Sequence, residues 1–263
     1  GAAHGDKEFI VHGDRRITYA EFLRSANSVS THLADDAGIV HGDRVAVLSQ
    51  NNPEWCLTFW ATVNLGAVLV GLNGWWTADE ILYGLEDSGA KVLVADAKRL
   101  ERIADQLDEI GCERVYLVDG DPVDFGNHPK IHSYSELLAS PSDTLPDTPI
   151  AEGDAAVIFY TSGTTGRPKG AVSTHRNMIA NLQNTVFVLT HGQMVMAAAA
   201  EQSGADDTGP EADLTGGRQP VSLFTAPLFH VSGCHSTLVV GMMAGMRLVM
   251  PVGRFDPEQA LQL

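Results

Sequence analysis

Residues 45–72, VAVLSQNNPEWCLTFWATVNLGAVLVGL, decide the fold class of this chain. The first four, Val45 to Leu48, are an apolar run typical of a strand buried on both faces. Residues 53–65 open with a proline and carry apolar side chains at helical spacing, and residues 67–72 form a second apolar run. Two buried strands joined by a helix of crossover length predict a βαβ unit with parallel strands.

The uncharged run from Trp55 to Ala78 is also long enough to be a membrane-spanning helix. Polar residues and glycines interrupt it, and its pattern changes midway from helical to strand-like. We therefore interpret it as a buried helix followed by a buried strand, and we expect no integral membrane span. The first residues do not show the charged and apolar regions of a signal peptide.

The alternation of helix and strand continues on both sides of this unit. Thr18 precedes Glu21 by three residues, the spacing of a capping box, and predicts a helix that includes residues 22–33. The pattern is that of an α/β fold with parallel sheets and flanking helices. The other expected elements are strands at 91–95, 115–118, 155–159, 221–226 and 246–250, and helices at 77–87, 97–110, 232–244 and from about Thr174.

Composition suggests how these elements are grouped. Residues 136–154 are acidic and proline-rich, which predicts a linker between an N-terminal subdomain, 1–150, and a second one, 151–263. The segment 201–220 has no apolar periodicity and is expected to be a loop. Asp256 and Pro257 begin a helix that would be too short to stand alone, so we expect an incomplete second subdomain and a longer parent protein.

Charge and cysteine content exclude several functional classes. The chain has 263 residues, 44% of them hydrophobic, with 17 Lys and Arg against 33 Asp and Glu, a net charge of −16. Such a charge argues against a nucleic-acid partner held by a basic surface. Three cysteines without a CxxC pair indicate neither a disulfide framework nor a zinc ribbon. A reducing compartment, the cytoplasm, fits this composition.

Residues 160–170, YTSGTTGRPKG, are the strongest functional signal in the sequence. They follow an expected strand directly and combine hydroxyl side chains, glycines that expose backbone N–H groups, and one lysine. Clusters of Ser, Thr and Gly are usually plain loops, but this combination suits a polyphosphate. It is not a Walker A loop, because Pro168 stands where a glycine is required, and no GxG pair supports a dinucleotide site.

The string resembles the phosphate-binding signature of the adenylate-forming enzymes, which include acyl-CoA synthetases, peptide-synthetase adenylation domains and firefly luciferase. The resemblance extends along nearly the whole chain and includes a segment similar to the family's aromatic-His element. Within the superfamily the complete loop looks more like that of acyl-CoA ligases than that of acyl-AMP ligases. The resembling segments are 17–21, 42–46, 51–54, 66–68, 160–170, 173–177 and 227–230.

The resemblance implies that a carboxylate, expected to be a fatty acid, attacks the α-phosphate of ATP and that CoA then displaces AMP. Lys169 would neutralise the β- and γ-phosphates and serve, with His230, as a catalytic residue. Mg²⁺ would be held mainly through the phosphates and by residues outside this chain. The implied nucleotide-binding residues are Thr161, Ser162, Gly163, Thr164, Thr165, Gly166 and Lys169. The implied acid-binding residues are Phe229, His230, Val231, Gly233 and Cys234.

Other reactive or aromatic residues are assigned structural roles. Cys234 is expected to be a small buried hydrophobe as well as a cavity neighbour, because the implied chemistry needs no covalent enzyme intermediate. His230 and His235 lack a convincing set of further ligands, and Pro129 separates His128 from His132, so no metal site is predicted. For Trp75 and Trp76 a place in the core is favoured over contact with a ligand.

The family's magnesium-binding acidic element, its ribose-binding Asp and its C-terminal lysine are not in this sequence, so the chain alone is expected to be inactive. Its expected partners are a small carboxylic acid and the C-terminal remainder of the protein, with a homodimer left open. Two alternatives remain. One is an acyl-AMP ligase that passes the acyl group to a carrier protein, and the other is a nucleotide-binding module without catalysis.

Overall fold

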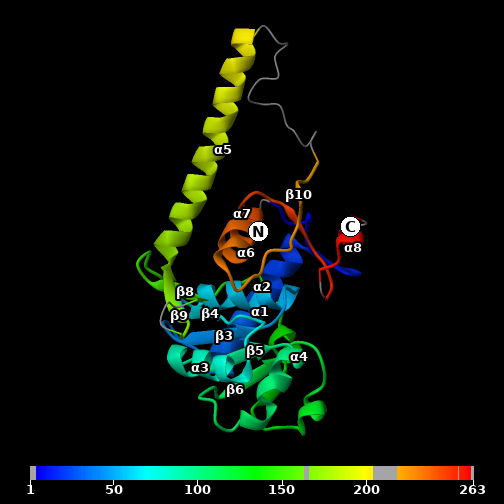
Figure 1. Cartoon of the computed structure of the whole chain (residues 1–263), viewed down its shortest axis with the longest axis vertical. Coiled ribbons are helices and arrows are strands. Elements are labelled where there is room, and N and C mark those ends of the chain that lie inside the picture. Colours follow the sequence, from blue (N-terminus) through cyan, green and yellow to red (C-terminus); the bar gives the residue numbers. More distant parts are fainter. Residues whose placement is uncertain (1–3, 163–165, 204–217, 254, 262–263) are drawn as a thin grey trace.

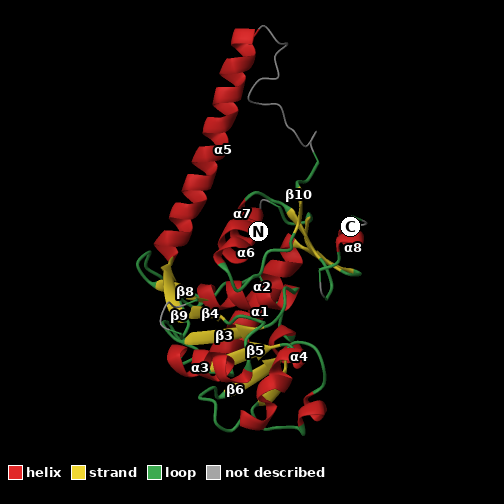
Figure 2. Ribbon diagram, in the orientation of Figure 1, coloured by secondary structure: helices red, strands yellow, loops and turns green. Residues whose placement is uncertain are grey.

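The computed structural model describes residues 4–162, 166–203, 218–253 and 255–261. Its centre is a seven-stranded sheet in the order β7-β6-β5-β3-β4-β8-β9 (Figures 1 and 2). All neighbouring strands in it are parallel except β8 and β9, which are antiparallel. The strands are β3 (Arg44–Leu48), β4 (Val68–Gly71), β5 (Val92–Ala95), β6 (Arg114–Leu117), β7 (Ile131–Ser133), β8 (Ala155–Thr161) and β9 (Lys169–Thr174).

Alternate side chains of the central strands enter two separate cores, as expected for strands buried on both faces. Val45 and Val47 pack in a cluster with residues of α1 (Tyr19–Asp35) and α2 (Pro53–Asn64). Ala46 and Leu48 point the other way, into a cluster with α3 (Ala78–Ser88) and α4 (Ala97–Leu100). The predicted α/β fold with parallel strands and flanking helices is therefore confirmed.

Local hydrogen bonds explain where the helices on these faces begin and end. Thr18 and Glu21 form the predicted capping box, with the Thr18 backbone N–H donating to the Glu21 carboxylate at 2.9 Å. Asn52 caps α2 by accepting from the Trp55 backbone N–H at 2.8 Å. Gly89 ends α3 with a left-handed φ of 58°, a conformation that glycine adopts without strain.

A second sheet of four strands, β10-β11-β1-β2, brings the two ends of the chain together. Its strands are β1 (Glu8–His12), β2 (Arg15–Thr18), β10 (Val221–Leu223) and β11 (Arg247–Met250). β1 pairs with β11 in parallel, and the hairpin of β1 and β2 was not expected from the sequence. Both sheets take strands from either side of residue 150, so the division at that residue stays a prediction about folding units.

Three stretches differ from the sequence-based expectation. The helix expected at 97–110 consists of α4 followed by a 3-10 helix at 101–106, because Ile103 has a non-helical φ of −123°. The helix expected at 232–244 is divided into α6 (Val231–Gly233), a π-helical stretch at 234–239 and α7 (Val240–Met243). Strand β9 lies between the glycine-rich turn and the long helix, so that turn closes a hairpin.

The long helix, α5 (His175–Ser203), begins one residue after its expected start and extends away from the sheets as a single rod (Figure 1). Most of the loop expected at 201–220 lies outside the described residues. The short helix expected after Asp256 is α8 (Pro257–Ala260). Within the described ranges we find no helix that combines the length and the apolar character needed to cross a bilayer.

Candidate active site

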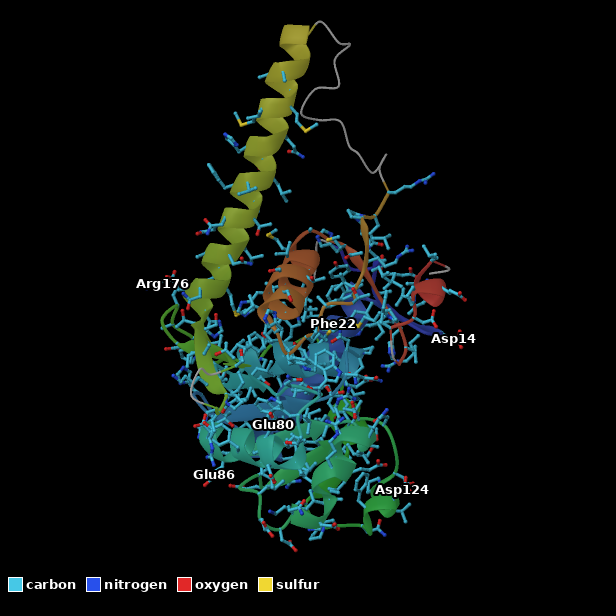
Figure 3. The ribbon with its side chains drawn as sticks, in the orientation of Figure 1. Asp14, Phe22, Glu80, Glu86, Asp124 and Arg176 are labelled. Atoms are coloured by element: carbon cyan, nitrogen blue, oxygen red, sulfur yellow. The ribbon has the colours of Figure 1, made fainter. Side chains whose placement is uncertain are left out.

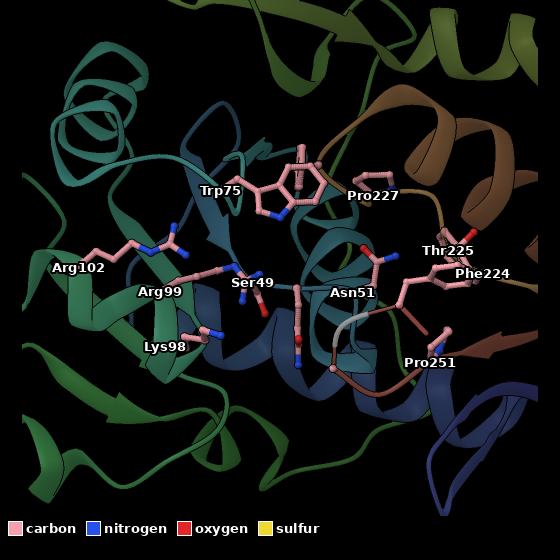
Figure 4. A pocket seen from close by; sticks show the side chains of 14 residues that line it. Ser49, Asn51, Trp75, Lys98, Arg99, Arg102, Phe224, Thr225, Pro227 and Pro251 are labelled. Atoms are coloured by element: carbon pink, nitrogen blue, oxygen red, sulfur yellow. The ribbon is translucent and has the colours of Figure 1, made fainter. Parts of the chain in front are cut away.

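A cavity of about 760 Å³ opens at the carboxyl ends of the parallel strands (Figure 4). In open α/β sheets this is the edge at which ligands bind. Its walls come from the segments that follow β3, β4, β5, β10 and β11. The lining residues are Ser49, Gln50, Asn51, Trp75, Lys98, Arg99, Arg102, Phe224, Thr225, Pro227, Phe229, Pro251, Gly253 and Phe255.

Asp96 holds two walls of this cavity together. Its carboxylate, only 2% exposed, accepts from the Gln50 backbone N–H at 2.9 Å and from the Ser49 hydroxyl at 3.2 Å. It also caps α4 and forms an ion pair with Arg99 at 2.6 Å. A buried charge with this many donors is well satisfied, which stabilises the loop after β3 against the helix after β5.

Asp96→Ala should lower the free energy of unfolding by about 3 kcal/mol, because it leaves the Arg99 guanidinium and a buried N–H group without their partner. Urea denaturation followed by circular dichroism measures the change. Asp105→Ala removes an exposed carboxylate nearby and should leave the midpoint in place. Equal midpoints for the two variants would contradict the role given to Asp96.

Two arginines position the tryptophan at the cavity wall. Arg99 and Arg102 both donate to the Gly74 carbonyl, at 3.1 and 3.0 Å, and Arg102 also donates to the Trp76 carbonyl at 2.7 Å. Trp75 between these carbonyls is 71% exposed, and its ring stands edge-on to that of Phe229 with centroids 5.3 Å apart. The expected core position is thus correct for Trp76 but wrong for Trp75, which lines the cavity (Figure 4).

The segment carrying the predicted acid-binding residues runs past the same cavity. Phe229 lines it, whereas His230 is exposed and caps α6 through its Nδ1 atom, which accepts from the Ser232 backbone N–H at 3.3 Å. This hydrogen bond assigns the proton of a neutral imidazole to Nε2. Val231 is 45% exposed, and the backbone of Gly233 packs against that of Pro227.

Cys234 is fully buried beneath this segment. Burial raises the pKa of its thiol well above the usual range, so it stays protonated and unreactive at neutral pH. The structural role expected for this side chain fits its surroundings. Its place in acid binding stays a prediction.

The predicted phosphate loop joins β8 to β9. Thr161 pairs with Lys169 across the hairpin, and its hydroxyl donates to the Lys169 carbonyl at 3.4 Å. Ser162 and Lys169 are exposed, and within the described part of the chain the Lys169 ammonium has no ion-pair partner. Gly166 has a φ of 92°, which favours glycine. Gly163, Thr164 and Thr165 lie outside the described residues.

The loop and the cavity share one edge of the sheet. Phe159 of β8 pairs with Gly71 of β4, two residues before β8 ends at Thr161 and the loop begins. A Cβ atom on Gly71 would lie 2.7 Å from the Phe159 ring and 3.2 Å from the Phe229 Cα atom. A glycine at this position therefore lets the aromatic-His segment pack directly on the strands that carry the loop.

His235 lies buried behind these residues, 5% exposed and tilted against Phe159 at 5.6 Å. Burial lowers the pKa of this imidazole below its ordinary value of 6.5.

His235→Phe should weaken the loss of stability on acidification. In the native state the depressed pKa keeps the ring neutral, while the unfolded chain binds a proton near pH 6.5. Stability is therefore fully present above that pH and falls as the pH drops below it. Urea unfolding at pH 7.5 and 5.5 measures the difference, which should be smaller in the variant. An unchanged difference would assign the pH dependence to other groups.

Several cavity residues were not found by motif, namely Ser49, Gln50, Lys98, Arg99 and Arg102. The available signal was their position, since each group directly follows an expected parallel strand. Among the described residues, no three or more His, Cys, Asp or Glu side chains are grouped so that they could hold a metal ion.

Comparisons with known proteins agree with this geometry. A model described as AMP-binding enzyme matches residues 1–263. Feruloyl-CoA synthase from Amycolatopsis sp is 30% identical over 96% of this chain and 42% of the relative. 4-Coumarate–CoA ligase 1 from Petroselinum crispum is 25% identical over 98% of this chain and 42% of the relative. The chain thus spans less than half the length of these curated relatives.

The N-terminal domain of FACL13 from Mycobacterium tuberculosis, solved with an inhibitor, superposes with a TM-score of 0.70 at 27% identity. The match covers 99% of this chain and 57% of that one. Sequence, fold and the position of the cavity lead to the same assignment: this chain belongs to the AMP-binding enzyme family, the adenylate-forming enzymes, and its relatives are acyl- and aryl-CoA ligases.

Proposed function

We propose that the protein containing this chain activates a carboxylic acid with ATP, forming an acyl-adenylate and pyrophosphate, and then transfers the acyl group to CoA. One observation carries the proposal. The loop that leads to Lys169 follows β8 at the carboxyl edge of the seven-stranded sheet, and the same edge holds a cavity of about 760 Å³ lined by cationic and aromatic side chains. Both ATP and CoA are polyanions, and the lining includes Lys98, Arg99 and Arg102.

In this proposal the loop stabilises charge that develops on the phosphates. The ammonium of Lys169 neutralises the β- and γ-phosphates, and hydroxyl and backbone N–H groups donate hydrogen bonds to them. Because Lys169 is exposed and has no ion-pair partner among the described residues, its charge is available to a ligand. The donors assigned to the loop are Thr161, Ser162, Gly163, Thr164, Thr165 and Gly166.

The acid would bind beside the aromatic-His segment. Phe229 and Trp75 offer apolar ring surface, and the Nε2–H group of His230 offers a donor for the carboxylate. Val231 is exposed next to them, whereas Gly233 and Cys234 would shape the cavity from beneath. A fatty acid is the proposed substrate, and an aromatic acid is the second candidate because the cavity has an aromatic wall and relatives are named for feruloyl and coumarate.

Magnesium would enter with the phosphates of ATP and neutralise part of their charge. The described residues do not offer a carboxylate cluster that fits the ion, so no step proposed here depends on metal binding by this chain. The remainder of the longer protein would supply the rest of the site. The cysteines of this chain are free and buried, which suits the cytoplasm.

Pyrophosphate exchange tests the proposal. The longer protein is incubated with ATP, labelled pyrophosphate and, in turn, fatty, aromatic and sterol-derived acids. Acid-dependent label in ATP is the expected result, and its absence with every acid would favour a nucleotide-binding module without catalysis. Thioester formation with CoA, compared with transfer to a carrier protein, distinguishes a CoA ligase from an acyl-AMP ligase.

A further inference from the structure

We infer that Tyr83 and Asp87 of α3 are positioning residues that hold both ends of the loop 162–168 and thereby increase the affinity of this loop for the phosphates of ATP. The inference rests on the proposed function of this loop. It comes from a set of contacts between α3 and the hairpin of β8 and β9.

The first end of the loop is held at Tyr160, near the end of β8. Its hydroxyl donates to the Asp87 carboxylate at 2.7 Å and lies 3.2 Å from the Gly84 carbonyl. Its ring stands edge-on to that of Trp76, with centroids 5.3 Å apart. Burial and the nearby Asp87 charge raise the pKa of the Tyr160 hydroxyl, so it remains a donor at neutral pH.

The second end is held at Arg167 and Pro168, directly before β9. The Tyr83 hydroxyl lies 3.2 Å from the Pro168 carbonyl and 3.4 Å from the Asp87 carboxylate, so its single proton is shared between them. The Arg167 guanidinium lies over the Tyr83 ring, with its Cζ atom 4.9 Å from the ring centroid. One turn of α3 therefore contacts the chain on both sides of the loop.

These contacts matter because the hairpin lies at an edge of the sheet. β9 is the edge strand of the sheet and pairs only with β8. A chain segment loses conformational entropy when it binds an anion, and contacts that restrain the residues on both sides of it beforehand reduce that loss. Asp87 is exposed and Tyr83 is half-buried, so their side chains can be changed without opening the core.

The test uses three variants of the longer protein. Asp87→Ala removes the carboxylate acceptor of Tyr160 and leaves only the longer contact with the Gly84 carbonyl. Asp87→Asn retains a neutral acceptor, and Tyr83→Phe removes the hydroxyl but keeps the ring under Arg167. Glu86→Ala is the matched control, because Glu86 is an exposed carboxylate on the same turn of α3 that points to solvent (Figure 3). Hydrogen–deuterium exchange of residues 160–170 and steady-state pyrophosphate exchange are measured for each protein.

In Asp87→Ala and Tyr83→Phe, exchange at residues 160–170 should be faster by about fivefold, the loss expected for one hydrogen bond. The KM for ATP should rise by a similar factor, with kcat and the KM for the acid within about twofold of wild type. Asp87→Asn should recover part of both changes, and Glu86→Ala should match wild type. A merely structural role for Asp87 would change thermal stability without separating the two KM values.

Wild-type hydrogen exchange and an unchanged KM for ATP in both variants would overturn the inference. Failure of the proposed function looks different, because the wild-type protein itself would then show no acid-dependent pyrophosphate exchange. In that case the hydrogen-exchange measurement still decides whether α3 holds the loop. Faster exchange together with wild-type ATP kinetics would also refute the inference, since the contacts would then not affect nucleotide binding.

Discussion

Lys169→Ala in the longer protein should slow acyl-adenylate formation by about tenfold or more. In the proposed mechanism the Lys169 ammonium carries the positive charge that the loop brings to the β- and γ-phosphates. Loss of that charge raises the energy of the leaving pyrophosphate more than that of bound ATP, so kcat and kcat/KM should both fall. Acid-dependent pyrophosphate exchange measures the change directly.

Two further variants sharpen this result. Lys169→Arg keeps the charge but alters its shape and reach, so it should recover only part of the rate. Lys7→Ala removes an exposed lysine outside the cavity and the loop, and should leave the rate unchanged. An unaltered rate in Lys169→Ala would remove this residue from the proposed role without affecting the family assignment.

Gly233→Ala is expected to have the largest effect on stability, a loss of about 3 kcal/mol or more. An added Cβ atom would overlap the Pro227 carbonyl oxygen and lie 2.9 Å from that of Ala226. Both obstacles are backbone atoms, so they cannot move aside as a flexible side chain would. The segment from Pro227 to His230 would shift, and the cavity wall at Phe229 would shift with it.

Gly192→Ala on α5 is the matched control for this change. Nothing lies within 4 Å of the Cβ position, and helical alanine is favoured over glycine, so stability should rise by about 0.5–1 kcal/mol. Urea unfolding of the same chain measures both variants. Equal effects of the two substitutions would show that close packing against Pro227 and Ala226 does not require a glycine at position 233.

Most regular elements could be predicted because their residues satisfy a local rule. β3, β4 and β5 are short apolar runs, and α1 has a capping box that the structure reproduces. β9 escaped prediction because it has no apolar alternation. Its sequence, KGAVST, is mostly exposed and becomes a strand only by pairing with β8. The prediction of a single helix at 97–110 was wrong for the opposite reason: the local pattern is present but the structure does not follow it. The helical spacing of apolar residues continues past Ile103, where the backbone is not helical.

The candidate site divides in a similar way. The loop at 160–170 and the segment at 227–230 could be identified because each is a contiguous run of residues with a recognisable chemistry. The cavity wall of Ser49, Trp75 and Arg99 has no such run, since two strands and two helices lie between its first and last members in the sequence. Trp75 in particular was expected in the core, and only the arginine hydrogen bonds to its neighbours show why it faces the cavity.

The sequence by itself determined the α/β class, the order of most strands and helices, and the family, because local spacing and a contiguous signature encode them. Only the tertiary structure decided which residues share the sheet edge beside the loop and how α3 contacts the two ends of that loop. The reason is physical. Parallel strands bring together chain segments far apart in sequence, and the side chains that meet there depend on register and packing.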